Sequence, residues 1–165
     1  MAIDIPSIVA VDSMTLVWGL RDVGTDQQCR DAKFLFSQFS ARKTQVVISA
    51  VSVSEYLTAI DHQQHEAVIA VLAKRFLIQP FTPDCAALAA VLFCRGQKMR
   101  TKGVEGGRAI LRADTLIIAT AKIHGAGCIY SNDGDCRDLA NTIHTNFGRD
   151  IPKPKLDLFK NPIVE

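Results

Sequence analysis

One apolar run that ends in an acid constrains the fold of this chain more than any other feature. The run from Ile8 to Val11 is apolar at every position, and Asp12 follows it directly. A strand has this pattern when both of its faces are covered, as they are in a parallel sheet. Parallel strands are joined by crossover connections that are usually helices. The run therefore predicts an α/β fold with Asp12 at the carboxyl end of a buried strand.

The rest of the chain alternates between strand and helix patterns. We expect further strands at 46–48, 76–78 and 128–130, and helices at 13–20, 26–39, 52–60, 65–75, 83–97 and 114–124, with a short helix from 138. This alternation predicts a parallel sheet with helices on both faces, and ligands of such sheets bind at the carboxyl ends of the strands. We expect a single domain over 1–165, with its core at about 8–139 and an irregular tail after about 149.

The composition narrows the class of protein without identifying a function. Hydrophobic residues make up 48% of the chain and charged residues 22%, which is ordinary for a globular domain, and a net charge of +2 is too small to indicate a nucleic-acid partner. The five cysteines include no C-x-x-C pair, which argues against a disulfide framework or a zinc ribbon. The longest apolar run, Cys85 to Cys94, is too short to span a membrane. We expect a cytoplasmic protein with no membrane partner.

Four acids are predicted to lie near one edge of the sheet. Asp12 ends the first strand, Glu55 lies early in the helix after the second, Asp114 opens the helix before the fourth, and Asp133 follows the fourth. The positions i+3, i+4 and i+7 after Asp114 are apolar, so its carboxylate faces the body of the protein. A carboxylate that faces inward needs a partner or a metal ion.

Each acid also has a purely structural explanation, and these alternatives stay open. Asp12 and Asp114 could cap the helices that follow them, and Ser52-x-x-Glu55 matches a capping box. Asp133 and Asp135 could form an Asx-type turn and a helix cap. The joint occurrence of the acids on one edge favours a shared site. Asp22, Asp31, Asp61, Asp138 and Asp150 lack this context and are interpreted as surface charges.

The order of these motifs resembles the PIN-domain family, and within it the toxin ribonucleases of VapC type. The resemblance rests on Val11-Asp12-Ser13, on Ser54-Glu55, on the run from Arg112 to Ala121 that contains Asp114, and on Gly127 to Asp135. It covers about Ile8 to Leu139, and the third and fourth pieces are the most specific.

The resemblance implies a fold, an activity and partners. The fold would be a three-layer α/β/α sandwich with a central, mainly parallel sheet, and the activity that of a Mg²⁺- or Mn²⁺-dependent endoribonuclease, a hydrolase. The family's catalytic and metal-binding acids map to Asp12, Glu55, Asp114 and Asp133, with Ser131 and Asp135 as accessory residues. A cognate antitoxin protein and a homodimer are the partners that the family implies.

The chemistry of four acids in one place is consistent with a metal ion. Carboxylates brought close together repel one another, and a hard divalent cation relieves that repulsion. Oxygen ligands without a His or Cys cluster favour Mg²⁺ or Mn²⁺ over Zn²⁺. We expect Asp12 and Asp114 to be the primary ligands, with Glu55 and Asp133 completing the site or holding waters.

A basic segment could draw RNA towards this acidic site. The segment from Arg95 to Arg112 is predicted to be mobile, and it carries the candidate RNA-binding residues Arg95, Lys98, Arg100, Lys102, Arg108 and Arg112. Cationic side chains supply most of the affinity for phosphates, and flexible single-stranded RNA is the expected substrate. An ordinary solvated loop is the alternative interpretation.

Two rival functions are weaker. A phosphatase of the haloacid-dehalogenase type needs a second Asp two residues after the first, and Met14 occupies that position. A PIN-like module that binds RNA or protein without cutting it is the other alternative, although all four acids are present.

Overall fold

The computed structural model describes residues 5–99 and 107–154, and its elements confirm the predicted alternation of strands and helices. In chain order they are β1 (Ile8–Val11), α1 (Ser13–Arg21), α2 (Asp26–Arg42), β2 (Gln45–Ser49), α3 (Ala50–Leu57), the 3-10 turn η1 (His62–Gln64), α4 (His65–Arg75), β3 (Leu77–Gln79), α5 (Pro83–Met99), α6 (Gly107–Ile123), β4 (Ile129–Tyr130), α7 (Gly134–Asn141) and β5 (Gly148–Arg149).

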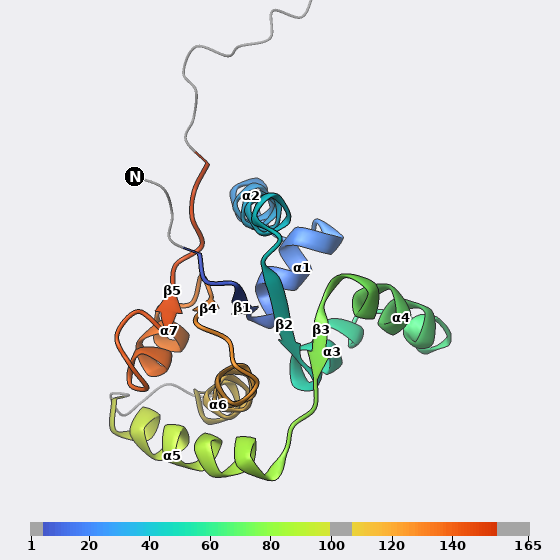
Figure 1. The fold of residues 1–165 in the computed structure, drawn as a ribbon. Coiled ribbons are helices and arrows are strands. Elements are labelled where there is room, and N and C mark those ends of the chain that lie inside the picture. The colour runs from blue at the N-terminus through green and yellow to red at the C-terminus, as the bar shows by residue number, and fades with distance from the viewer. Residues whose placement is uncertain (1–4, 100–106, 155–165) are drawn as a thin grey trace, which may run out of the picture.

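The strands form one parallel sheet in the order β3-β2-β1-β4-β5. The first strand of the chain is thus the central one, with β2 on one side and β4 on the other. Helices α1 and α2 cover one face of the sheet, and α5 and α6 cover the other (Figure 1). This arrangement confirms the predicted three-layer α/β/α sandwich.

Each face of the sheet has its own hydrophobic core, because successive side chains of a strand point to opposite faces. Val9 and Val11 of β1 belong to the core under α1 and α2, together with Leu35. Ala10 belongs to the core under α5 and α6, together with Ile118. Burial on both faces explains why β1 is a continuous apolar run that places Asp12 at its end.

The structure departs from the sequence predictions at three elements. Helix α6 begins at Gly107, so Asp114 lies about two turns inside it and is not its N-cap. Helix α7 begins at Gly134, earlier than expected, and β5 was not predicted at all. The predicted mobile segment 95–112 is helical at both ends, since α5 runs to Met99; residues 100–106 lie outside the described part of the chain.

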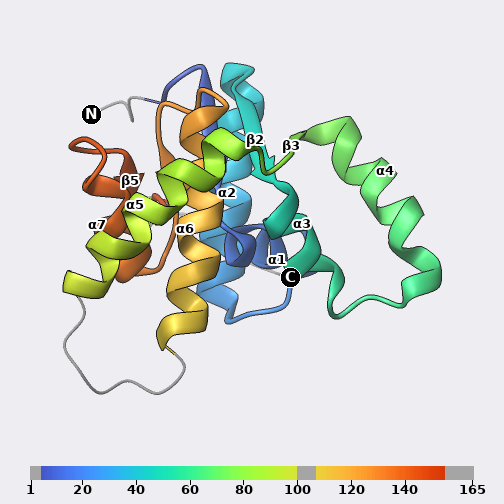
Figure 2. The same cartoon turned by 90° about the horizontal axis from the view of Figure 1, so that it is seen from below.

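Helix α4 lies apart from the other helices, beyond the edge strand β3 (Figures 1 and 2). Of its side chains only Leu72 is buried, whereas Ile69 is 40% and Val71 57% exposed. Among the helices of residues 5–99 and 107–154, none is both long and apolar enough to cross a membrane.

Candidate active site

Asp12 occupies the point where β1 passes into α1, and both of its carboxylate oxygens are engaged. Oδ1 accepts a hydrogen bond from the backbone N–H of Thr15 at 2.7 Å, which caps the helix. Oδ2 accepts a hydrogen bond from the hydroxyl of Ser131. The capping role considered from the sequence is therefore present, and it uses only one of the two oxygens.

The Asp12 carboxylate is costly to keep charged at this position. Asp12 is only 9% exposed. Burial raises the pKa of Asp12, the hydrogen bonds from Ser131 and Thr15 lower it in part, and the negative charge of Asp133 raises it again. A positive charge placed beside these two carboxylates would be stabilised by both of them.

Ser131 links Asp12 to the turn after β4. Its side chain is buried, and its Oγ accepts a hydrogen bond from the backbone N–H of Asp133 at 3.0 Å while donating to Asp12. Asp133 then caps α7, because its Oδ1 accepts from the N–H groups of Asp135 at 2.8 Å and Cys136 at 3.4 Å. The Asx turn proposed from the sequence is thus present, and the carboxylate of Asp133 remains exposed.

The charge of Asp114 acts on the buried thiol of Cys136, as do the charges of Asp12 and Asp133. Burial raises the pKa of Cys136 well above its usual value, and the charges of Asp114, Asp12 and Asp133 raise it further. Asp114 comes from α6 and is half-buried. Three of the four predicted acids therefore act on one thiol. Cys136 is not among the residues that the sequence predicts for the site, although its position three residues after Asp133, in the first turn of α7, was a usable signal.

Glu55 is joined to α1 through Ser13, the residue that follows Asp12. The hydroxyl of Ser13 donates a hydrogen bond to its Oε2. The capping box proposed for Ser52 and Glu55 is wrong, because Ser49 caps α3 through the N–H groups of Val51 and Ser52. Ser13 was not among the predicted site residues, although its position directly after Asp12 was a usable signal.

The donor set suits a hard cation, but it is not a ready-made cage. In the described ranges, no three His, Cys, Asp or Glu side chains are grouped closely enough to hold a metal ion. Mg²⁺ commonly binds proteins through only one or two carboxylates, and keeps several waters or takes substrate phosphates instead. The buried carboxylate of Asp12 fits this mode of binding, because its hydrogen bonds offset its burial only in part and the negative charge of Asp133 acts on it as well.

The predicted RNA-binding cations have different environments. Arg95 donates a hydrogen bond to the carbonyl of Thr142 at 2.7 Å, and the Arg112 guanidinium lies 5.6 Å from the centre of the Phe93 ring. Lys98 is exposed at the end of α5. Arg100 and Lys102, and the side chain of Arg108, lie outside the part of the chain that the structure describes.

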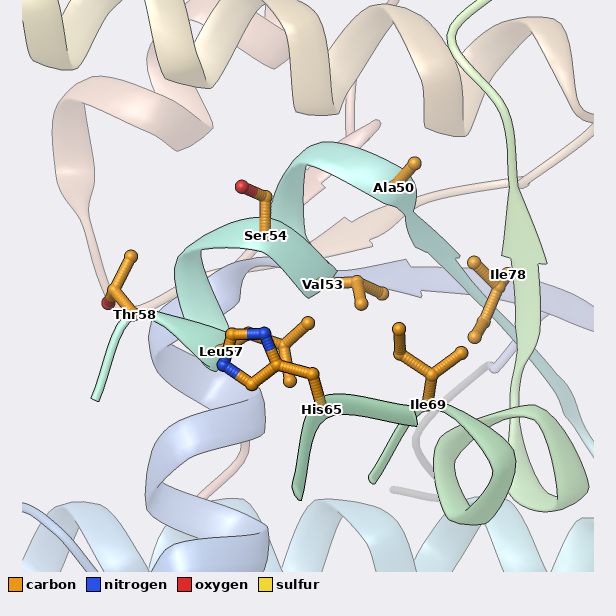
Figure 3. Close-up of a pocket in the computed structure, with 8 residues that line it drawn as sticks. All are labelled: Ala50, Val53, Ser54, Leu57, Thr58, His65, Ile69 and Ile78. Carbon is orange, nitrogen blue, oxygen red and sulfur yellow. The ribbon is translucent and has the colours of Figure 1, made fainter. Parts of the chain in front are cut away.

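A separate apolar pocket opens between α3, α4 and β3 (Figure 3). It is lined by Ala50, Val53, Ser54, Leu57, Thr58, His65, Ile69 and Ile78. None of the four predicted acids lines it. The lining is mostly apolar and includes Ile69 of α4, so the pocket suits an apolar partner better than a phosphate.

Comparison with known proteins gives a consistent result. The family model of the PIN domain matches residues 9–141. No curated protein matches the chain.

Solved structures share the fold at low sequence identity. VapC20 of Mycobacterium tuberculosis, a sarcin–ricin loop cleaving toxin, superposes with a TM-score of 0.57 at 18% identity, over 88% of this chain and 99% of that one. VapBC2 of Rickettsia felis, bound to a promoter DNA fragment, superposes with a TM-score of 0.57 at 16% identity, over 88% of this chain and 99% of that one. DNA-bound VapBC of Salmonella typhimurium superposes with a TM-score of 0.57 at 11% identity, over 87% of this chain and 98% of that one.

Proposed function

The chain belongs to the PIN domain family, and on this premise we propose that it is a metal-dependent endoribonuclease, the toxin of a toxin–antitoxin pair. The observation that carries the proposal is the hydrogen-bonded run from Asp12 through Ser131 to Asp133, with Asp114 acting on the same buried thiol. The fold shared with a sarcin–ricin loop cleaving toxin supports RNA as the substrate.

Asp12 and Asp114 would hold Mg²⁺ or Mn²⁺, with Asp133 and Glu55 beside them. When bound, such an ion supplies positive charge to the phosphate and eases the ionisation of water. The oxygen-only donor set supports this assignment, as does the burial of Asp12, which its hydrogen bonds offset only in part.

The protein's own residues would fix the geometry of the reaction. Hydrogen bonds from Thr15 and Ser131 hold both oxygens of Asp12, so the plane of its carboxylate is set before substrate arrives. Glu55 and Asp133 are exposed, and these are the carboxylates that can accept hydrogen bonds from water in the open site. No side chain needs to act as a covalent nucleophile, since water attacks phosphorus directly. Asp135, exposed in the first turn of α7, would be an accessory acid.

RNA would approach along the end of α5 and the start of α6. Lys98 and Arg112 present exposed positive charge there, and a phosphate backbone is attracted to such charge without regard to sequence. Arg95 also lies on this part of α5, but its guanidinium is bonded to Thr142.

An antitoxin would be the partner protein. The apolar pocket described above, with Leu57 of α3, Ile69 of α4 and Ile78 of β3 in its lining, is the surface that such a partner would cover. Contiguous exposed apolar surface marks protein interaction sites more often than it marks substrate sites for nucleic acid.

The proposal is tested by incubating the protein with total RNA and with a structured RNA hairpin, in Mg²⁺ or Mn²⁺ and in chelator. We expect metal-dependent cleavage by the wild type and by Asp138→Asn, which alters an exposed acid of α7, and loss of cleavage in Asp114→Asn. Equal cleavage by all three proteins would indicate a contaminating nuclease. RNA binding without cleavage by the wild type would favour the non-catalytic module.

A further inference from the structure

Arg137 on α7 reaches back to the turn that carries Ser131 and Asp133. Its Nη1 donates a hydrogen bond to the backbone carbonyl of Ser131 at 2.9 Å. The same nitrogen lies 3.2 Å from Oδ1 of Asp150, which follows β5. The Arg137 side chain is only 25% exposed, so the first of these bonds is shielded from water. One guanidinium nitrogen therefore joins the turn after β4 to the segment after β5.

Ser131 is held at every polar atom by a different part of the chain. Its N–H donates to the carbonyl of Arg149 at 3.0 Å, and its carbonyl accepts from Arg137. Its hydroxyl donates to Asp12 and accepts from the N–H of Asp133. The orientation of that hydroxyl depends on the backbone being fixed, because χ1 rotation alone cannot keep both of its bonds if the turn moves.

The packing of α7 against β5 leaves this arrangement no freedom to slide. A Cβ on Gly148 would lie 2.3 Å from the carbonyl oxygen of Arg137, so the strand backbone touches the helix backbone directly. The N–H of Gly148 also donates to the side chain of Asn141 at 2.9 Å, near the end of the same helix. Arg137 thus sits where the backbone of α7 lies against the backbone of β5.

We propose that Arg137 is a positioning residue of the acidic site, which it serves by fixing the Ser131 carbonyl, with Asp150 as its counter-ion. The proposal rests on the proposed nuclease function. The groups that act directly on Asp12 are Ser131, Thr15 and Asp133. Arg137 is not among them, so its effect on the site would come through the position of Ser131. A guanidinium suits this role because it stays charged at all relevant pH values and presents its donors in a fixed plane. Asp150, interpreted from the sequence as a surface charge, has a partner in the structure.

The test compares Arg137→Met and Arg137→Lys with Arg21→Met as a matched control. Arg21 also donates a guanidinium hydrogen bond to a backbone carbonyl, that of Ala59, at 3.2 Å, but it lies at the far end of α1 from Asp12. The first measurement is amide hydrogen exchange at Asp133 by NMR, because this N–H donates to Ser131. The second is the kcat and KM of RNA cleavage in Mn²⁺.

We expect Arg137→Met to speed exchange at Asp133 about tenfold and to lower kcat about tenfold with KM within about twofold, the size of one lost charge-assisted hydrogen bond. Arg137→Lys should recover part of both effects, and Arg21→Met should show neither. Asp150→Asn, which keeps the guanidinium, should give a smaller change in the same direction if Arg137→Met fails to fold.

Equal exchange rates at Asp133 in the Arg137 and Arg21 variants would overturn the positioning role. So would a rise in KM with kcat unchanged, which would make Arg137 a substrate-binding residue. A wild-type protein that cleaves no RNA would instead overturn the proposed function, and the exchange rates alone would then decide whether Arg137 holds the turn.

Discussion

Ser13 on α1 donates a hydrogen bond to the carboxylate of Glu55 on α3, 42 residues further along the chain. Ser13 follows Asp12 directly, so this bond ties the exposed carboxylate of the site to the buried one. Ser13 itself is 8% exposed, which limits competition from water. The relationship gives Glu55 a fixed orientation that its own helix does not supply.

Ser13→Ala should lower the kcat of RNA cleavage about tenfold, since a hydrogen bond to a charged group is worth roughly 1.5–3 kcal/mol. The substitution leaves all four acids in place, so metal affinity should change less than kcat. Ser37→Ala is the control, because Ser37 also uses its hydroxyl, at 2.7 Å from the carbonyl of Phe34, but on α2. Equal kcat values for Ser13→Ala and Ser37→Ala would show that the orientation of Glu55 by Ser13 does not contribute to cleavage.

Asp12→Asn should stabilise the protein at neutral pH while abolishing cleavage. Burial raises the pKa of Asp12 above its ordinary 3.8 in the folded chain. Below pH 3.8 the carboxyl of Asp12 is protonated in both the folded and the unfolded chain. As the pH rises, this carboxyl loses its proton first in the unfolded chain. The free energy of unfolding therefore falls until the pH passes the pKa of Asp12 in the folded chain. Asparagine avoids that loss and still offers an oxygen to the Thr15 N–H.

The measurement is the melting temperature of wild type and Asp12→Asn across pH 3 to 8, where each kcal/mol corresponds to about 2–4 °C. The variant's advantage should be largest near neutral pH and should disappear towards pH 3. The exposed Asp138→Asn should show no such trend. A variant that melts below the wild type at pH 7 would contradict the argument.

Mn²⁺ should raise the melting temperature of the wild type and should leave the double variant Asp12→Asn, Asp114→Asn unchanged. A ligand that binds only the folded state stabilises it by mass action, by about 2.7 kcal/mol at a hundredfold excess over Kd. Chelator should return the wild type to its metal-free value. A shift of equal size in both proteins would place the ion elsewhere on the surface.

Two glycines on either side of Arg137 should respond differently to an added methyl group. Gly148→Ala places a Cβ 2.3 Å from the backbone oxygen of Arg137, which cannot rotate away. We therefore expect the free energy of unfolding to fall by about 1–3 kcal/mol or more. Gly134→Ala meets only the Arg137 Nη2 at 3.9 Å, an ordinary contact, and alanine favours a helix. Urea unfolding of the two variants gives the comparison; similar midpoints would contradict the close packing of β5 on α7.

Lys98→Gln should weaken RNA binding by a catalytically inactive Asp114→Asn protein and should reduce the salt dependence of log K by about one unit of slope. Lys74→Gln is the control, since it removes the same exposed charge from α4, which lies apart from α5 and α6. Arg95→Gln should additionally lower stability, because the guanidinium bond to Thr142 is lost. An unchanged slope for Lys98→Gln would exclude this end of α5 from the RNA path.

Strand β1 and the acid at its end could be predicted because burial on both faces leaves a continuous apolar run. The apolar stripe that follows Asp114 on α6 could also be predicted, and its residues are buried as expected. The start of α6 was misplaced because Gly103, Gly106 and Gly107 indicated a loop, and tertiary packing overrides such weak local preferences. The single-domain boundaries stay a prediction.

Other features depend on contacts between distant segments and had no local signal. Strand β5 is two residues long, Gly148 and Arg149, and no periodicity can be read from two residues. The contact of Glu55 with Ser13 competes with a capping box that the sequence matches equally well. Nothing in the sequence around Asp150 distinguishes it from a surface charge, and its ion pair with Arg137 depends on how α7 packs against β5.

The central place of β1 in the sheet has a consequence for synthesis. The side chains of Asp12 and Ser131 are joined although 119 positions separate them along the chain. A ribosome must therefore release nearly the whole polypeptide before the first acid meets its buried hydroxyl. Translation stopped between Glu55 and β4 yields fragments that keep Asp12 and Glu55 but have no Ser131 or Asp133. The proposed nuclease site would thus be incomplete on any nascent chain that has not yet been extended past Asp133.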